Sequence, residues 1–318
     1  MSEKLPFQTV TFITIEEDRV GQRLDNFLIG LLKGVPKSRI YRIIRDGQVR
    51  VNKKRASQTT RLEAGDEVRV PPIRVADTSA APVVGESFAE ALSRALLYED
   101  DQLLVYNKPT GLAVHGGSGI SLGLIETLRA IRPADTQLEL VHRLDRDTSG
   151  LIMVARKRSF LRRIQQLMKD GGIEKRYWLL TQGYKGAQRT VTAPLLKLTQ
   201  SNNERVVRVS RDGKESVTHF QLVQRLHNTQ LVEALLETGR THQIRVHAQY
   251  SGFPVLGDPK YGTPSTNSQL QAHGLNRLFL HARTLKFRHP GSGQWLTLEA
   301  PLDAQFERAI ATLAENAL

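Results

Sequence analysis

Apolar residues change their spacing several times along the first 70 positions. They alternate or cluster over residues 7–15, which predicts a leading strand. Residues 23–32 have helical spacing, and Pro36 can open a second helix that ends at Gly47. Further short strands are expected over residues 48–52 and 66–70. The pattern therefore predicts a small domain in which two short helices are followed by strands.

A stretch without clear periodicity follows this domain. It begins at Pro71-Pro72, continues through Thr78-Ser79-Ala80-Ala81-Pro82 and carries little charge up to about residue 93. Proline and small residues in this arrangement are typical of a linker. We therefore expect four parts along the chain: an N-terminal extension (1–19), the small domain (20–75), a linker (76–93) and a large domain (94–318).

In the large domain, helical and strand patterns alternate irregularly. Helices are expected over residues 121–131 and 158–168. Strands are expected over residues 103–106, 176–181, 206–210, 216–224 and 230–236. Several consecutive strands without intervening helices predict an α+β fold, with flanking helices on a mixed, mainly antiparallel sheet.

Positive charge is in excess and unevenly distributed. Lysine and arginine outnumber aspartate and glutamate by 45 to 32, so the formal charge of the 318-residue chain is +13. Such an excess implies a polyanionic partner, whether nucleic acid, an anionic membrane or an acidic protein. Between residues 33 and 61, ten cations accompany a single acid, Asp46. These cations are Lys33, Lys37, Arg39, Arg42, Arg45, Arg50, Lys53, Lys54, Arg55 and Arg61.

Other features of the composition narrow the class of protein. The chain has no cysteine, which excludes disulfides, thiolate metal sites and cysteine nucleophiles. No apolar run approaches the roughly 20 residues that a membrane span needs. Residues 1–18 alternate polar and apolar positions and then turn acidic, unlike a signal peptide. We therefore expect a cytoplasmic protein with no membrane partner.

Residues 142–150, His-Arg-Leu-Asp-Arg-Asp-Thr-Ser-Gly, set Asp145 between two arginines and between β-favouring segments. Nearby positive charge favours the ionised form of a carboxylate. An ionised carboxylate suits a nucleophile or an acid–base group that works near a polyanionic substrate. The same string is also compatible with a polar turn, in which residues 147–149 bond to the local backbone before Gly150. The residues by themselves leave both interpretations open.

The string at 142–150 resembles the central motif of the RluA-type pseudouridine synthases. Residues 107–111, Asn-Lys-Pro-Thr-Gly, and residues 239–247, Gly-Arg-Thr-His-Gln-Ile-Arg-Val-His, are similar to two further motifs of that family. In the first of these, Lys108 and the backbone N–H groups of a turn could face a phosphate. His142, which opens the central motif, is also expected to contact RNA.

The resemblance implies roles for four residues. Asp145 occupies the position of the catalytic aspartate, and Arg245 that of the arginine that pairs with it, since a buried guanidinium would hold the carboxylate ionised and oriented. Tyr177 occupies the place of an aromatic residue that stacks near the target base. Arg143 matches the residue that fills the position vacated by a flipped base.

The small domain resembles the S4 RNA-binding domain. The matching strings are Arg23-Leu24-Asp25, Ser38-Arg39 and Gly47-Gln48-Val49-Arg50-Val51-Asn52. At about 100° per residue, Arg39, Arg42 and Arg45 lie together on one side of the second predicted helix. A cationic helix is often only a solvated face. Ten cations against one acid, beside an RNA-modifying motif, favour RNA contact by this helix and by residues 53–55.

The reaction that the resemblance implies is the isomerisation of uridine to pseudouridine. It involves no redox change and no group donor, so no cofactor is expected, in agreement with a sequence that lacks a P-loop or a dinucleotide fingerprint. Within the family, the strings are most similar to those of members that modify several uridines in the 23S RNA of the bacterial large ribosomal subunit. We expect 23S ribosomal RNA to be the partner and the protein to be a monomer.

Two other functions stay open as alternatives. An RNA N-glycosylase also attacks C1′ but usually needs a second carboxylate, for which Asp147 is the nearby candidate. A non-catalytic RNA-binding or ribosome-assembly protein would use the large domain only as a platform. A metal site is not expected, because His242 and His247 lie five positions apart, about 140° around a helix, and no cysteine or nearby glutamate completes a set.

Overall fold

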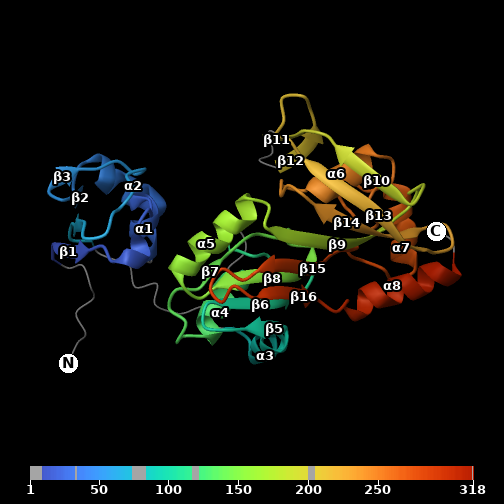
Figure 1. Ribbon diagram of the computed structural model, residues 1–318, viewed down its shortest axis with the longest axis horizontal. Helices are drawn as coiled ribbons and strands as arrows, with labels where there is room; N and C mark the ends of the chain where they lie inside the picture. The colour runs from blue at the N-terminus through green and yellow to red at the C-terminus, as the bar shows by residue number, and fades with distance from the viewer. Residues whose placement is uncertain (1–8, 33, 74–83, 117–121, 200–204, 317) are drawn as a thin grey trace. The chain divides into compact units, whose positions relative to one another are not determined.

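The computed structural model describes residues 9–32, 34–73, 84–116, 122–199, 205–316 and 318. The chain divides into two compact units, Met1–Val83 and Val84–Leu318. Figure 1 shows the first unit in blue and the second in colours from teal to red. Among the described residues, no helix is both long enough and apolar enough to cross a membrane.

The first unit packs two helices against a four-stranded antiparallel sheet with the order β1-β4-β2-β3. Its elements are β1 (Thr11–Thr14), the 3-10 turn η1 (Glu17–Arg19), α1 (Leu24–Leu31), α2 (Lys37–Arg45), β2 (Arg50–Val51), β3 (Lys54–Arg55) and β4 (Glu67–Val70). One hydrophobic core joins them, with Leu28 from α1, Ile44 from α2 and Val68 from β4. The expected order of helices and strands is confirmed, although the leading strand is shorter than residues 7–15.

The second unit is built on a ten-stranded sheet with the order β10-β13-β14-β9-β15-β8-β6-β5; β16 also pairs with β15, and β7 with β8. These strands are β5 (Leu96–Glu99), β6 (Leu103–Lys108), β7 (Glu139–Leu140), β8 (Ser149–Ala155), β9 (Ile173–Thr181), β10 (Gln188–Thr192), β13 (Val217–Arg225), β14 (Gln230–Leu236), β15 (Leu280–Arg288) and β16 (Trp295–Glu299). A separate hairpin consists of β11 (Leu195–Thr199) and β12 (Arg205–Val209). The α+β class with a mixed, mainly antiparallel sheet is confirmed.

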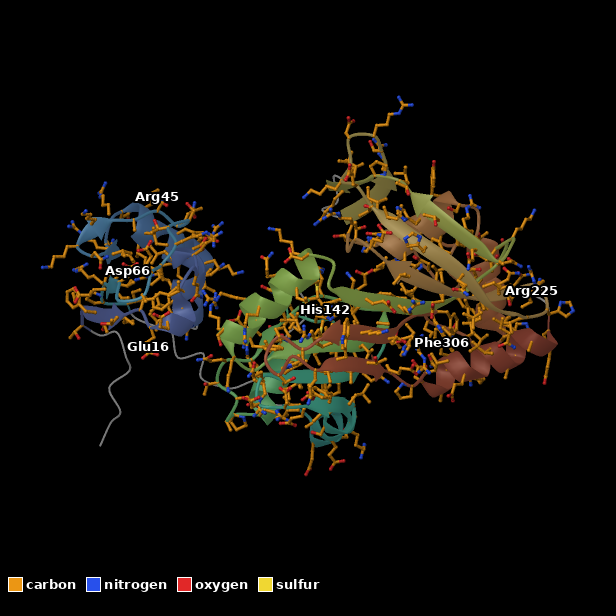
Figure 2. All side chains as sticks on the ribbon, viewed as in Figure 1. Glu16, Arg45, Asp66, His142, Arg225 and Phe306 are labelled. Atoms are coloured by element: carbon orange, nitrogen blue, oxygen red, sulfur yellow. The ribbon has the colours of Figure 1, made fainter. Side chains whose placement is uncertain are left out.

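Helices cover different parts of this sheet (Figure 1). They are α3 (Glu86–Arg94), α4 (Leu124–Ile131), α5 (Arg158–Lys169), α6 (Gln243–Tyr250), α7 (Pro264–Ala272) and α8 (Ala304–Glu315). The helices α4 and α5 share a core with β6 and β8, in which Phe160 and Val154 are fully buried. The helix α8 packs through Phe306 against Phe279, with ring centroids 5.7 Å apart (Figure 2).

Two segments differ from what the sequence predicts. Residues 76–93 read as a linker, but the structure has the helix α3 over Glu86–Arg94, because Leu92 joins the buried core of the second unit; residues 76–83 lie outside the described residues. The turn expected at residues 107–111 begins later, because β6 continues to Lys108, where it pairs with Gly150 of β8.

The strands β8 and β15 meet in a short parallel pairing near the middle of the sheet, at His281↔Ser149 and Ala282↔Gly150. Gly150 has a φ of +104°, and a Cβ there would lie 2.3 Å from the Ala282 carbonyl oxygen, so this close approach requires glycine. The Ser149 hydroxyl also lies 2.8 Å from Nδ1 of His281. These contacts fix the start of β8, and with it the loop that carries Asp145, beside β15.

Candidate active site

Asp145 lies in the loop between β7 and β8 and contacts an arginine from a distant part of the chain. Arg245 on α6 donates from Nη1 to Oδ2 of Asp145 at 3.0 Å, across 100 sequence positions. Arg245 is only 6% exposed, whereas the Asp145 side chain is 21% exposed. The pair borders a cavity of about 130 Å³ that is also lined by Arg143, Tyr177 and His242. The carboxylate is thus held by a buried cation and still open to a ligand.

A second carboxylate fixes the guanidinium of Arg245. Asp258 accepts from Nε at 2.7 Å and from Nη2 at 2.8 Å, a bidentate pair. It also accepts from the backbone N–H groups of Lys260 and Tyr261. Burial raises the pKa of Asp258, but the hydrogen bonds and charge of Arg245, together with the two backbone N–H groups, bring it below its usual value. One guanidinium thus binds two carboxylates, the fully buried Asp258 and the more exposed Asp145.

Asp258 was not among the site residues predicted from the sequence. A second acceptor for Arg245 could have been expected, because a buried guanidinium carries five N–H donors and one carboxylate cannot accept from all of them. Local backbone geometry also supports the placement. Gly257 has a φ of +72°, and a Cβ there would lie 1.8 Å from the Arg277 carbonyl oxygen, so only glycine allows the turn that aims Asp258 at Arg245.

Tyr177 lines the same cavity from β9, the strand between β14 and β15. Burial raises the pKa of Tyr177, and the negative charge of Asp145 raises it further. The hydroxyl therefore stays protonated at neutral pH and can donate a hydrogen bond. The sheet brings an aromatic face, a hydroxyl and a carboxylate to one cavity, as the sequence predicts for Tyr177 and Asp145.

The two arginines beside Asp145 do not hold it. Arg146 pairs instead with Asp147, with its Nε 3.0 Å from Oδ1. Arg143 is exposed, lines the cavity, and has no ion-pair partner among the residues that the structure describes. The cation that contacts Asp145 is therefore Arg245 from α6, and neither of the two arginines near it in the sequence. Arg143 is left free to meet a ligand.

Lys108 does not face a phosphate, contrary to expectation. Its side chain is fully buried, and Nζ donates to the carbonyl oxygens of Pro109, Leu112 and Arg146, each at 2.9 Å. Burial lowers the pKa of Lys108 to about 7. The lysine joins the turn after β6 to the loop that carries Asp145, because all three of its donors are occupied by the backbone.

His142 is likewise engaged by the protein. Its Nε2 accepts from the backbone N–H of Met153 at 3.2 Å, which extends the pairing beside β8. Burial, followed by the charge of Lys175, lowers the pKa of His142 to about 4, so the ring is neutral. His142 is half-buried and is not among the residues that line the cavity, so its expected RNA contact stays a prediction. Figure 2 shows His142 within the second unit.

Two further histidines have separate environments. His242 lines the cavity, and its Nε2 lies 3.8 Å from Oδ2 of Asp145. His247 is buried, with Nδ1 2.9 Å from the Thr218 hydroxyl and Nε2 2.9 Å from the Ala193 carbonyl oxygen. Within the described part of the chain, no group of three or more His, Asp or Glu side chains could hold a metal ion. From the sequence, His242 was considered only as a possible metal ligand, and its position beside Asp145 was not predicted.

The expected RNA-contacting cations lie in the first unit. On α2, Arg39, Arg42 and Arg45 are exposed while the isoleucines of the opposite face are buried, as the helical spacing predicts. Figure 2 labels Arg45 at the surface of this unit.

A tight hairpin presents the three other cations of this unit that are expected to contact RNA, Lys53, Lys54 and Arg55, all of which are exposed. Between β2 and β3, Asn52 and Lys53 both have positive φ, at 50° and 65°. Positive φ at both central residues is the geometry of a two-residue type I′ turn. The Asn52 amide also donates to Asp66 at 2.7 Å.

Comparison with known proteins identifies the class. The family model of RNA pseudouridylate synthases matches residues 102–250, and that of the S4 domain matches residues 22–68. The chain belongs to the RNA pseudouridylate synthase family and is an isomerase.

Individual relatives extend over nearly the whole chain. Ribosomal large subunit pseudouridine synthase C of Salmonella typhi is 51% identical over 313 residues, which cover 97% of this chain and 98% of that protein. The protein of the same name from Escherichia coli K12 is 52% identical over 309 residues, with coverages of 96% and 97%. A solved structure, human RNA pseudouridylate synthase domain containing 4, matches with a TM-score of 0.59 at 28% identity, covering 71% of this chain and 95% of that one.

Proposed function

We propose that this protein converts uridines to pseudouridine in the 23S RNA of the large ribosomal subunit, at several sites. The observation that carries the proposal is the Asp145–Arg245 pair, 3.0 Å apart at the edge of a cavity that Tyr177 also lines. Relatives that are named for the large ribosomal subunit and are about half identical over nearly the full chain support the choice of RNA.

The proposed reaction moves one bond and one proton. The N1–C1′ bond breaks, the uracil turns within the cavity, a C5–C1′ bond forms, and the proton of C5 is lost while N1 gains one. Asp145 acts at C1′, at C6 or on the 2′ proton, and all three routes need an ionised carboxylate. The buried guanidinium of Arg245 holds this carboxylate at the edge of the cavity through its contact with Oδ2.

Other residues are assigned to binding. The target base must leave its stack to reach Asp145, and we assign Arg143 to the position that the base vacates. Tyr177 then offers its ring face to the flipped base and its protonated hydroxyl as a donor.

The exposed arginines of α2 and residues 53–55 attract the RNA backbone. The isomerisation has no net redox change and no group donor, so the proposed enzyme needs no cofactor. We place it in the cytoplasm, as a monomer.

An N-glycosylase is the alternative that the geometry disfavours. Hydrolysis of the glycosidic bond calls for a second carboxylate that can activate water or protonate the leaving group. Asp147 is paired with Arg146, and Asp258 is fully buried in its pair with Arg245. Neither carboxylate is among the residues that line the cavity beside Asp145, which supports isomerisation.

Tritium release from 5-tritiated 23S RNA tests the proposal. We expect turnover by the wild-type protein, and none by Asp145→Asn, which is nearly isosteric but uncharged and should still bind RNA. Mapping by carbodiimide-dependent primer extension, in ribosomal RNA from cells with and without the gene, identifies the modified uridines. Substantial turnover by Asp145→Asn would refute the assignment of the carboxylate, and free uracil in the product would favour the N-glycosylase.

A further inference from the structure

The His242 ring lies near the candidate aspartate, Asp145, and its other nitrogen is hydrogen-bonded to Tyr261. Its Nε2 lies 3.8 Å from Oδ2 of Asp145, and its Nδ1 lies 2.8 Å from the hydroxyl oxygen of Tyr261. The residue precedes α6 with a left-handed φ of +55°, which sets the direction of the ring. The reaction as proposed above uses neither contact of this ring.

The hydrogen bonds of Tyr261 determine which nitrogen of His242 carries the proton. The Tyr261 hydroxyl accepts from the backbone N–H of Val207, on β12, at 3.0 Å. It has one proton to donate, and Nδ1 of His242 is the acceptor that lies within bonding distance of it among the described residues. Burial raises the pKa of Tyr261, so this proton is retained at neutral pH. An arrangement in which Nδ1 accepts gives the hydroxyl proton a partner, whereas an Nδ1–H donor would leave that proton unpaired among the described residues.

The His242 ring is consequently neutral with its proton on Nε2. Burial lowers its pKa, and Arg245 and Lys260 lower it further, while Asp145 and Asp258 raise it; the net direction is downward. A neutral imidazole whose Nδ1 accepts a hydrogen bond carries the proton on Nε2. That N–H group is on the side of the ring nearest Asp145.

We infer that His242 is a positioning residue for Asp145 in the isomerisation proposed above. Its Nε2–H lies near Oδ2, the same oxygen that Arg245 contacts, and two donors on one oxygen leave Oδ1 to react. Oδ1 has no hydrogen-bond partner within the described part of the chain. The 3.8 Å separation exceeds a hydrogen bond, and such contacts often tighten only when substrate binds. This inference rests on the proposed function.

Two substitutions at position 242 separate the two nitrogens of the ring. The asparagine amide reaches the place of Nδ1, so His242→Asn keeps an acceptor for Tyr261 but loses the donor toward Asp145. The glutamine amide reaches the place of Nε2, so His242→Gln keeps the donor. We expect His242→Asn to lose about 10-fold or more in kcat with little change in KM, and His242→Gln to stay within about 3-fold of wild type. If misfolding caused the loss of activity, His242→Asn would instead be the more active variant, because asparagine tolerates the positive φ at this position better than glutamine does.

A double-mutant cycle tests whether Tyr261 acts through His242. Tyr261→Phe removes the hydroxyl but keeps the ring, whose centroid lies 5.0 Å from the Arg245 guanidinium carbon. We expect Tyr261→Phe to lower kcat in the wild-type background and to have no further effect in His242→Asn. Additive losses in kcat would show that Tyr261 acts independently of His242, and would overturn the inference that it acts through the His242 ring.

A measurement without substrate completes the test. Nitrogen-15 spectra of the histidine side chains, assigned with His242→Asn, should show Nδ1 of His242 unprotonated and Nε2 protonated at pH 7. Protonation at Nδ1 would overturn the inference. Its failure and that of the proposed function are distinguishable: a wild-type protein without pseudouridine activity contradicts the function, whereas an active wild type with full kcat in His242→Asn contradicts only the positioning role.

Discussion

Replacing Asp258 by asparagine tests whether the buried carboxylate determines the geometry of the active site. The substitution keeps the shape of the side chain but removes its charge and turns one acceptor into a donor. That amide nitrogen would then face an N–H group of Arg245, where the structure has hydrogen bonds of 2.7 and 2.8 Å. The guanidinium loses its bidentate partner and keeps only the single contact with Asp145.

The expected cost follows from burial. Removing one partner of a buried ion pair destabilises a protein by about 3–5 kcal/mol, and we expect the lower end, about 3 kcal/mol, because Asp145 still contacts Arg245. Freed from Asp258, the guanidinium can turn to bind both oxygens of Asp145, which would occupy the oxygen that reacts. We therefore expect kcat to fall by about 10-fold or more in the fraction that stays folded.

Urea unfolding followed by tryptophan fluorescence measures the stability change. Both tryptophans, Trp178 and Trp295, lie in the second unit. Asp135→Asn is the control, because this carboxylate also accepts from arginine, but its two arginine partners are 23% and 26% exposed and retain Glu99. We expect it to cost only about 1 kcal/mol and to leave tritium release unchanged. Equal stability losses for the two variants, with full activity in Asp258→Asn, would refute the reasoning.

Three further predictions concern other parts of the chain. Changing the three exposed arginines of α2 to glutamine should weaken RNA binding and reduce the slope of log K against log salt by about 2; an unchanged slope would remove α2 from the RNA interface. Burial lowers the pKa of His281 to about 4, below its unfolded value, so unfolding takes up a proton and stability should fall by up to about 3 kcal/mol between pH 6.5 and 4. Urea unfolding should show a weaker pH dependence in His281→Gln, and equal dependence would contradict this. Gly150→Ala should destabilise the second unit by several times the cost of about 1 kcal/mol expected for Gly171→Ala, where φ is also positive but no atom lies within 4 Å; similar melting temperatures would refute the close-approach argument.

Local regularities were predictable because they depend on neighbours in sequence. The spacing of apolar residues predicts α2 with its arginines on the exposed face, and the structure has that helix over Lys37–Arg45. The β-favouring segment that follows Gly150 lies in β8, and all seven residues of this strand are buried. In contrast, β6 continues through Lys108 because pairing with β8 overrides the local turn signal.

The sequence by itself determined the class of protein, the basic character of the first unit and the identity of Asp145, Arg245 and Tyr177 as candidates. Only the tertiary structure decided how they work together. The arginines on either side of Asp145 in the sequence do not bind it: Arg146 binds Asp147, and Asp145 is held by a residue 100 positions away. The physical reason is that the ion pairs of a buried site depend on which side chains the fold places within a few ångströms, and neither Asp258 nor the proton position on His242 can be read from local spacing.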